Sequence, residues 1–208
     1  PLGSVPVDDT ICAQLMHDPV FSYVPEAHVQ EHSLEVQLPF LQEFLLSDFS
    51  IVPILLGDQS AETAAAVAKV LSGYFSDPEN LFIVSTDLSH YPSYNDAVET
   101  DRNTVEALCS NIPERFIRQI DRPKTQAVSN LSTCMCGWPA TLCLLYLTEG
   151  NRNIVYHPIL YQNSGDMKLY GDKERVVGYQ SVAVVEKTQT EKVQFSLHHS
   201  EKQSLLEI

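Results

Sequence analysis

Long apolar runs are missing from this sequence of 208 residues, which contains no stretch of roughly 18 consecutive apolar residues. A helix that crosses a membrane is therefore not expected, and no basic segment followed by an apolar one marks a signal peptide. Basic residues are also scarce, because 13 Lys and Arg stand against 27 Asp and Glu, giving a net charge of −14. Such a charge opposes binding to nucleic acid and to anionic membranes.

Cysteine is sparse and occurs in an odd number. The five cysteines are Cys12, Cys109, Cys134, Cys136 and Cys143. They provide no even disulfide framework and no C-x-x-C pair, so a structural zinc site of the usual type is not expected. Free thiols suit a reducing compartment, which predicts a cytoplasmic protein.

Strand and helix patterns alternate in the middle of the chain. Residues 49–57, "FSIVPILLG", and residues 80–87, "NLFIVSTD", are apolar runs typical of strands buried on both faces. Between them, residues 60–75 are rich in Ala and have helical periodicity. Strand, helix and strand with short connections predict a βαβ unit. The expected fold is α/β, with a central, mostly parallel or mixed sheet flanked by helices.

The remaining elements are predicted from helical and alternating periodicity and from turn residues. Further helices are expected at 8–16, 33–46, 95–109, 113–120 and 139–148, further strands at 21–23, 153–165 and 176–186, and a polar loop at 166–174. We expect one α/β domain over residues 1–186. Residues 187–208 are expected to form a charged linker and the start of a second domain.

One short motif indicates zinc. His28, Glu31 and His32 fit the H-x-x-E-H pattern of inverted zinc proteases. That chemistry requires both histidines on a single helix face. Pro25 lies three residues before His28 and Ser33 is a better helix start, so the two histidines are expected to flank a turn. The peptidase interpretation is therefore disfavoured.

The segment "STDLSHYP", residues 85–92, follows a predicted buried strand. Ligand sites of open α/β sheets lie at the carboxyl ends of such strands. Asp87 would orient the imidazole of His90, which would act as a base or a ligand. Alternatively, Asp87 caps the next helix and His90 is a solvated loop residue. The residues alone leave both interpretations open.

The segment "STCMCGWPATLCLL", residues 132–145, places Cys136 just before a predicted helix. A helix N-terminus favours a thiolate, which suits a nucleophile or a ligand for a soft metal. The alternative is that Cys136 is a small buried apolar residue, as is expected for Cys143. His198 and His199 are adjacent but lie in the predicted linker, where a solvated pair is expected.

Together these segments resemble the MEMO family, named for a mediator of cell motility. The resemblance rests on "EHSLEVQLPFLQ" from residue 31, "NLFIVSTDLSHY" from residue 80 and "CMCGWPATLCLL" from residue 134, in the family's order and at about its spacing. The first residues, "PLGSVPVD", and "VVGYQSVAV" at residues 176–184 also resemble family segments. The resemblance covers residues 1 to about 185.

The resemblance implies a LigB-like fold, similar to that of class III extradiol dioxygenases, with a pocket for non-haem iron or for copper. It implies catalytic roles for Asp87, His90 and His32, and a metal-ligating role for Cys136. The family's two other histidine ligands lie in H-A-G-Y and G-x-S-H-H motifs, and neither motif occurs in this sequence. The chain is therefore expected to hold only the C-terminal portion of the domain, with two histidine ligands absent.

Two further expectations concern partners. The pocket is expected to bind a small molecule or a peptide, and the alternative to a dioxygenase-like enzyme is a non-enzymatic domain that binds a peptide or protein there. The C-terminal "FSLHHSEKQSLLEI" resembles the start of an AMMECR-type domain, a type associated with a radical-SAM protein. This implies an AMMECR-type domain in cis and a radical-SAM protein as a partner.

Overall fold

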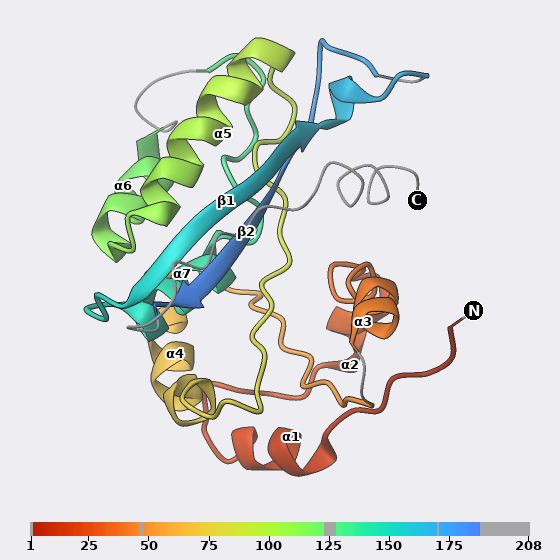
Figure 1. Cartoon of the computed structure of the whole chain (residues 1–208), viewed down its shortest axis with the longest axis vertical. Coiled ribbons are helices and arrows are strands. Elements are labelled where there is room, and N and C mark those ends of the chain that lie inside the picture. The colour runs from red at the N-terminus through yellow and green to blue at the C-terminus, as the bar shows by residue number, and fades with distance from the viewer. Residues whose placement is uncertain (1, 46–47, 123–127, 170, 188–208) are drawn as a thin grey trace.

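The structure, a computed structural model, describes residues 2–45, 48–122, 128–169 and 171–187 (Figure 1). These residues form seven α-helices and one antiparallel pair of strands, which confirms a mixed α/β protein. The helices are α1 (Asp9–Leu15), α2 (Pro25–Val29), α3 (Leu38–Phe44), α4 (Ala61–Phe75), α5 (Tyr94–Cys109), α6 (Pro113–Asp121) and α7 (Trp138–Thr148). The strands are β1 (Ile154–Asn163) and β2 (Gly178–Glu186), and the short 3-10 helix η2 (Ser164–Asp166) follows β1.

The helix ends follow signals in the sequence. The side-chain oxygen of Ser60 caps α4 by accepting a hydrogen bond from the Thr63 N–H at 3.0 Å, and Ser93 caps α5 in the same way. Proline lies in the first turn of α2, α3, α6 and α7, where its missing N–H breaks no helical hydrogen bond. The structure confirms, to within one residue at each end, the helices predicted at 8–16, 60–75, 95–109, 113–120 and 139–148.

The helix predicted at 33–46 is wrong at its start. Residues 33–37 form turns, and α3 begins only at Leu38. The reason is Pro39, whose ring is tolerated in the first turn of a helix but not further along it.

The core lies where four helices meet the strand pair. α4 packs against α7, and α5 packs against α6 and against both strands. Figure 1 shows α5 and α6 along one side of β1 and β2. The largest fully buried apolar side chains are Phe116, Met135, Leu142, Leu145 and Val176. Burial of each large apolar side chain stabilises the fold by about 1.5–3 kcal/mol.

The two strands form an antiparallel ladder. It pairs Ile154 with Glu186 at one end and Asn163 with Gly178 at the other. The register shifts just after Pro158, which has no N–H to donate and is therefore compatible with a bulge. The structure confirms the strands predicted at 153–165 and 176–186.

The prediction of a mostly parallel central sheet is wrong for the residues that the structure describes, where the one sheet is small and antiparallel. The strands predicted at 21–23 and 80–87 are absent, and the one at 49–57 is reduced to a single parallel bridge between Val7 and Ile51. An apolar run predicts extended, buried chain, but a strand also requires a neighbour in hydrogen-bonding register.

The segment between α4 and α5 shows what happens when an apolar segment has no neighbouring strand to pair with. It runs as extended chain, drawn in yellow in Figure 1, and no ladder forms over residues 81–87. The side chains of Leu81 and Ile83 are 69% and 44% exposed, although a strand buried on both faces would cover them. The sequence therefore correctly predicted an extended backbone in this segment. The predicted pairing of this segment with a neighbouring strand was wrong.

The predicted linker and second domain at 187–208 lie outside the described residues, apart from residue 187. His198 and His199 also lie outside them. In the part of the chain that is described, no helix combines the length and the apolar character that a membrane crossing requires.

Two glycines allow a matched test of this packing. A Cβ on Gly178 would overlap the carboxylate of Asp101, whereas a Cβ on Gly73, an exposed residue inside α4, would meet nothing within 4 Å. We expect Gly178→Ala to lower the free energy of unfolding by about 1–3 kcal/mol, the usual effect of overpacking. Gly73→Ala should raise it by about 0.5–1 kcal/mol, because Gly is a poor helix former.

Urea unfolding followed by circular dichroism measures both changes. Equal stability of Gly178→Ala and the wild type would contradict the close approach of Asp101 to β2.

Candidate metal centre

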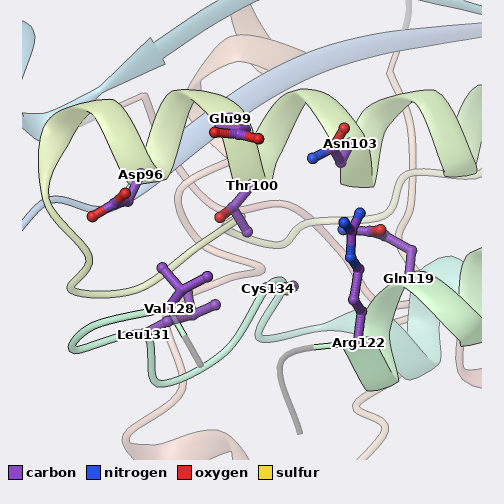
Figure 2. Close-up of a pocket in the computed structure, with 9 residues that line it drawn as sticks. All are labelled: Asp96, Glu99, Thr100, Asn103, Gln119, Arg122, Val128, Leu131 and Cys134. Atoms are coloured by element: carbon purple, nitrogen blue, oxygen red, sulfur yellow. The ribbon is translucent and has the colours of Figure 1, made fainter. Parts of the chain in front are cut away.

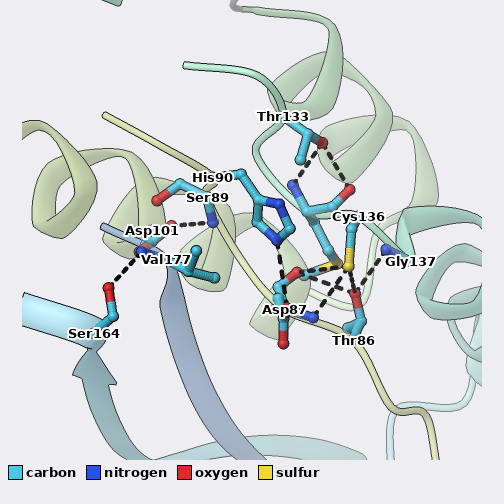
Figure 3. A network of polar contacts seen from close by, with 11 residues as sticks. Thr86, Asp87, Ser89, His90, Asp101, Thr133, Cys136, Gly137, Ser164 and Val177 are labelled. Carbon is cyan, nitrogen blue, oxygen red and sulfur yellow. Dashed lines mark hydrogen bonds and ion pairs between the residues drawn. The ribbon is translucent and has the colours of Figure 1, made fainter. Parts of the chain in front are cut away.

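Backbone hydrogen bonds bring two distant loops together. The Cys136 N–H donates to the Asp87 carbonyl at 3.2 Å, and the His90 N–H donates to the Thr133 carbonyl at 3.1 Å. The Ser132 N–H donates back to the His90 carbonyl at 3.0 Å. The loop before α5 and the loop before α7 therefore run side by side (Figure 3).

The same loop is also bonded to β2 and to the residues just before it. The Leu88 N–H donates to the Gly178 carbonyl at 2.8 Å, and the Gly178 N–H donates to the Ser89 carbonyl at 2.9 Å. The Tyr91 N–H donates to the Val176 carbonyl at 2.7 Å. Residues 87–91 therefore lie between β2 and the loop before α7, and both neighbours fix their backbone.

Three side chains converge where these loops meet. Asp87, His90 and Cys136, here termed the ligand cluster, each offer one ligand atom, and these atoms all lie within 4.8 Å of one another. His90 Nε2 and Asp87 Oδ2 are 3.4 Å apart. Nε2 is buried, yet it makes no hydrogen bond within the described residues, because the Asp87 contact has the distance of an ion pair without hydrogen-bond geometry. A nitrogen, a sulfur and a carboxylate oxygen therefore lie close enough to share one metal ion.

The position of the Cys136 sulfur depends on Thr86. The Asp87 N–H donates to the sulfur at 3.3 Å, and the Thr86 hydroxyl lies 3.4 Å from it. Thr86 Oγ1 also accepts a hydrogen bond from the Gly137 N–H at 2.7 Å. A Cβ on Gly137 would lie 2.7 Å from the same oxygen, so this position requires Gly. The backbone donor from Asp87 suits a negatively charged sulfur.

These positions answer the structural part of the alternatives that the sequence left open. The N-cap of α5 is Ser93, so Asp87 does not cap that helix. The His90 side chain is 23% exposed and therefore partly enclosed by neighbours. Cys136 is exposed and is not a core residue, whereas Cys143 is buried as predicted.

The two histidines of the H-x-x-E-H motif do not share a helix face. α2 ends at Val29, so His28 lies in its last turn and His32 lies beyond it. This confirms that the two histidines do not share a helix face, although the short helix that contains His28 was not predicted. His32 is exposed and is not part of the ligand cluster. Its backbone N–H and that of Ser33 donate to Glu31 Oε1 at 2.8 and 2.7 Å.

Residues beside the cluster were not predicted from the sequence. Tyr91 has a left-handed backbone with φ of 73°, which is costly for a residue other than Gly and often occurs at functional sites. Its ring lies 5.6 Å from the His90 ring and 4.7 Å from the Arg175 guanidinium carbon. Burial and, to a lesser extent, the Asp87 carboxylate raise the pKa of Tyr179 on β2. Nothing in the local sequence signals the conformation of Tyr91, whose N–H donates to the carbonyl of the distant Val176.

A separate pocket of about 150 Å³ lies between α5, α6 and the loop before α7 (Figure 2). It does not include the ligand cluster, whose Asp87 side chain is 44% exposed. Its lining residues are Asp96, Glu99, Thr100, Asn103, Gln119, Arg122, Val128, Leu131 and Cys134. The ligand cluster thus lies outside this pocket, with Asp87 and Cys136 accessible at the surface and His90 Nε2 buried beside them.

These features define an α/β protein in which two loops and one strand gather a set of possible metal ligands. A model of a family described as Memo-like protein matches residues 1–183. The chain therefore belongs to the Memo-like family.

Relatives from several organisms agree with this assignment. A MEMO1 family protein of Thermotoga petrophila is 35% identical over 185 residues, which cover 87% of this chain and 61% of the relative. One of Saccharolobus solfataricus is 34% identical, covering 86% of this chain and 61% of the relative. One of Thermoplasma acidophilum is 32% identical, with coverage of 89% and 65%. The chain thus spans less than two thirds of the length of these relatives.

The environments of the cysteines predict an order of chemical reactivity. Burial raises the pKa of Cys134 to about 11 and that of Cys143 to about 12, whereas Cys136 is exposed. At pH 8 a thiol with a pKa of 11 is only about one part in a thousand thiolate. We expect iodoacetamide to modify Cys136 at least about tenfold faster than Cys134 or Cys143, because the thiolate is the nucleophile.

Peptide mapping by mass spectrometry measures the three rates in the folded chain. In Cys136→Ser the fast modification should disappear while Cys134 and Cys143 stay slow. Fast labelling of either buried cysteine in the native protein would show that the core around it is open.

Proposed function

We propose that Asp87, His90 and Cys136 bind a redox-active transition-metal ion, iron or copper, and that this centre binds a small molecule or a peptide. The observation that carries the proposal is the convergence of three different donor atoms within 4.8 Å. Sulfur and imidazole donors favour transition metals such as iron, copper or zinc over Mg²⁺ and Ca²⁺. Three protein ligands also leave open positions, as catalytic metal sites require.

The fit of the residues to a metal ion can be judged from His90. Its Nε2 is buried without a hydrogen bond among the described residues, a costly arrangement that a bound ion would relieve. The Asp87 and Cys136 ligand atoms are the nearest possible partners of the same ion. The donor set therefore fits a divalent transition metal.

When bound, iron would supply redox chemistry with O₂ of the kind used by the class III extradiol dioxygenases that the family resembles. The chain itself contributes positioning and proton transfer. Thr86 and the Asp87 N–H hold the sulfur in place. The Asp87 carboxylate, whose side chain is 44% exposed, is accessible enough to exchange a proton with a bound molecule, and its Oδ2 lies 3.4 Å from His90 Nε2.

The surroundings of the cluster offer contacts for an organic ligand. The side chains of Tyr91 and Tyr179 are 42% and 44% exposed, and Arg175 lies over the Tyr91 ring. His32 stays a prediction as a further site residue. Gln37, five residues beyond it, donates to Ser85 Oγ at 2.9 Å and thereby connects that segment to the chain beside Thr86. The AMMECR-type domain and the radical-SAM partner stay predictions.

Metal analysis of the 208-residue chain tests the proposal. We expect the wild type to retain about one equivalent of iron(II) or copper after anaerobic loading and desalting, as measured by plasma mass spectrometry. Cys136→Ala and His90→Ala should each weaken metal binding by more than about tenfold, because each removes a ligand and even outer-shell changes reach that size.

Cys12→Ala and His157→Ala are matched controls, since both remove the same residue type outside the cluster. They should leave metal retention unchanged. Retention of metal by Cys136→Ala at the wild-type level would overturn the proposed site. A wild-type chain that retains no metal yet binds a peptide would identify a non-enzymatic binding domain and overturn the proposal.

A further inference from the structure

The carboxyl group of Asp101 is fully buried although it lies outside the ligand cluster. Asp101 is on α5 and is 0% exposed. Its Oδ1 accepts a hydrogen bond from the Ser89 N–H at 2.9 Å, and its Oδ2 accepts one from the Tyr161 hydroxyl at 2.7 Å. No basic side chain of the described residues forms an ion pair with it. Carboxylates are almost never fully buried without a charged partner, so this one requires an explanation.

Burial raises the pKa of Asp101, and the hydrogen bonds from Tyr161 and Ser89 only partly oppose this effect. The protein therefore accepts an unfavourable desolvation free energy at this position. Such a cost would be avoided by Asn or Leu if the position served packing alone.

Asp101 connects four parts of the structure. It belongs to α5, it accepts from the loop at Ser89, and it accepts from β1 at Tyr161. Its carboxylate also lies directly against Gly178, the first residue of β2. Figure 3 shows Asp101 behind Ser89, on the far side of the loop from Cys136.

The residue that Asp101 holds is next to the ligand cluster. Ser89 directly precedes His90 and follows Asp87 by two positions. Its carbonyl is already fixed by the Gly178 N–H, so Asp101 completes the restraint by binding its N–H. An ionised acceptor makes hydrogen bonds roughly twice as strong as a neutral one. Its negative charge would also favour a cation at the cluster.

We propose that Asp101 is a positioning residue for the metal centre, whose buried carboxylate fixes residues 88–90 so that His90 and Asp87 converge on Cys136. This inference rests on the proposed function. Asp101 does not touch the metal ion or a substrate. It acts through Ser89, in the way that outer groups orient metal ligands and tune their affinity.

Asp101→Asn tests the role of the charge with little change of shape. The Asn oxygen can still accept from Ser89, so the fold should be kept while the negative charge is lost. With cobalt(II) as the probe, we expect binding about 10 to 100 times weaker than that of the wild type. The thiolate-to-cobalt absorption band should also shift, because the geometry at Cys136 and His90 changes.

Thr148→Val is the matched control for loss of a buried hydrogen bond. Thr148 is 0% exposed at the other end of α7 from Cys136, and its hydroxyl bonds to Asn111, Tyr156 and the backbone. This variant should lose stability and keep the wild-type cobalt affinity and spectrum. If Asp101→Asn also kept the wild-type affinity and spectrum, Asp101 would be structural only and the proposal would be wrong.

Tyr161→Phe keeps the test decisive if Asp101→Asn does not fold. It removes one of the two hydrogen bonds to the carboxylate and leaves the charge. We expect a change of the cobalt spectrum in the same direction and of smaller size. An unchanged spectrum in Tyr161→Phe would contradict the role of this hydrogen bond in positioning.

A metal-free measurement separates failure of this inference from failure of the proposed function. If the wild type bound no cobalt, the proposed function would be wrong. The imidazole signals of His90 in nuclear magnetic resonance spectra of the metal-free chain would still report its position. They should shift or broaden in Asp101→Asn while those of His157 stay unchanged. Unchanged His90 signals would overturn the positioning role itself.

Discussion

The structure of the site depends on backbone hydrogen bonds that hold residues 87–91 between β2 and the loop before α7. Each neighbour lies far away in the sequence, yet together they fix both edges of a segment of only five residues. The fixed backbone determines where Asp87 and His90 point, and its bond to the Cys136 N–H brings the sulfur to the same place. The side-chain chemistry therefore follows from backbone pairing.

Two unfavourable local arrangements are maintained by this pairing. Tyr91 keeps a left-handed backbone because its N–H is bonded to Val176, and Asp101 keeps a buried carboxylate because Ser89 and Tyr161 donate to it. Each arrangement costs free energy that the surrounding structure must supply. Their location next to the ligand cluster is consistent with a site in which precise geometry is required.

The sequence was sufficient to predict most helices and extended segments. It was insufficient to predict which extended segments pair in a sheet. Caps such as Ser60 and first-turn prolines such as Pro113 are local signals, so most helices could be placed closely. The apolar run at 80–87 identified extended chain, but hydrogen-bonding neighbours are a property of the tertiary fold. At the site, Asp87 and His90 were singled out because they lie at the end of the apolar run at 80–87 or just after it, and Cys136 because it precedes α7; the structure shows that the three side chains lie close together. Asp101 and Tyr161 were missed, since a buried Asp in a helix looks like any exposed one.

The central claim is that one metal ion binds to Asp87, His90 and Cys136 together. The most direct measurement is a crystal structure of the chain grown anaerobically with iron(II), using anomalous scattering at the iron edge. One strong peak is expected at about 2.0–2.3 Å from His90 Nε2 and Cys136 Sγ, the usual metal–ligand distances. A fully ordered loop with no peak there, or a peak bound only by other residues, would contradict it.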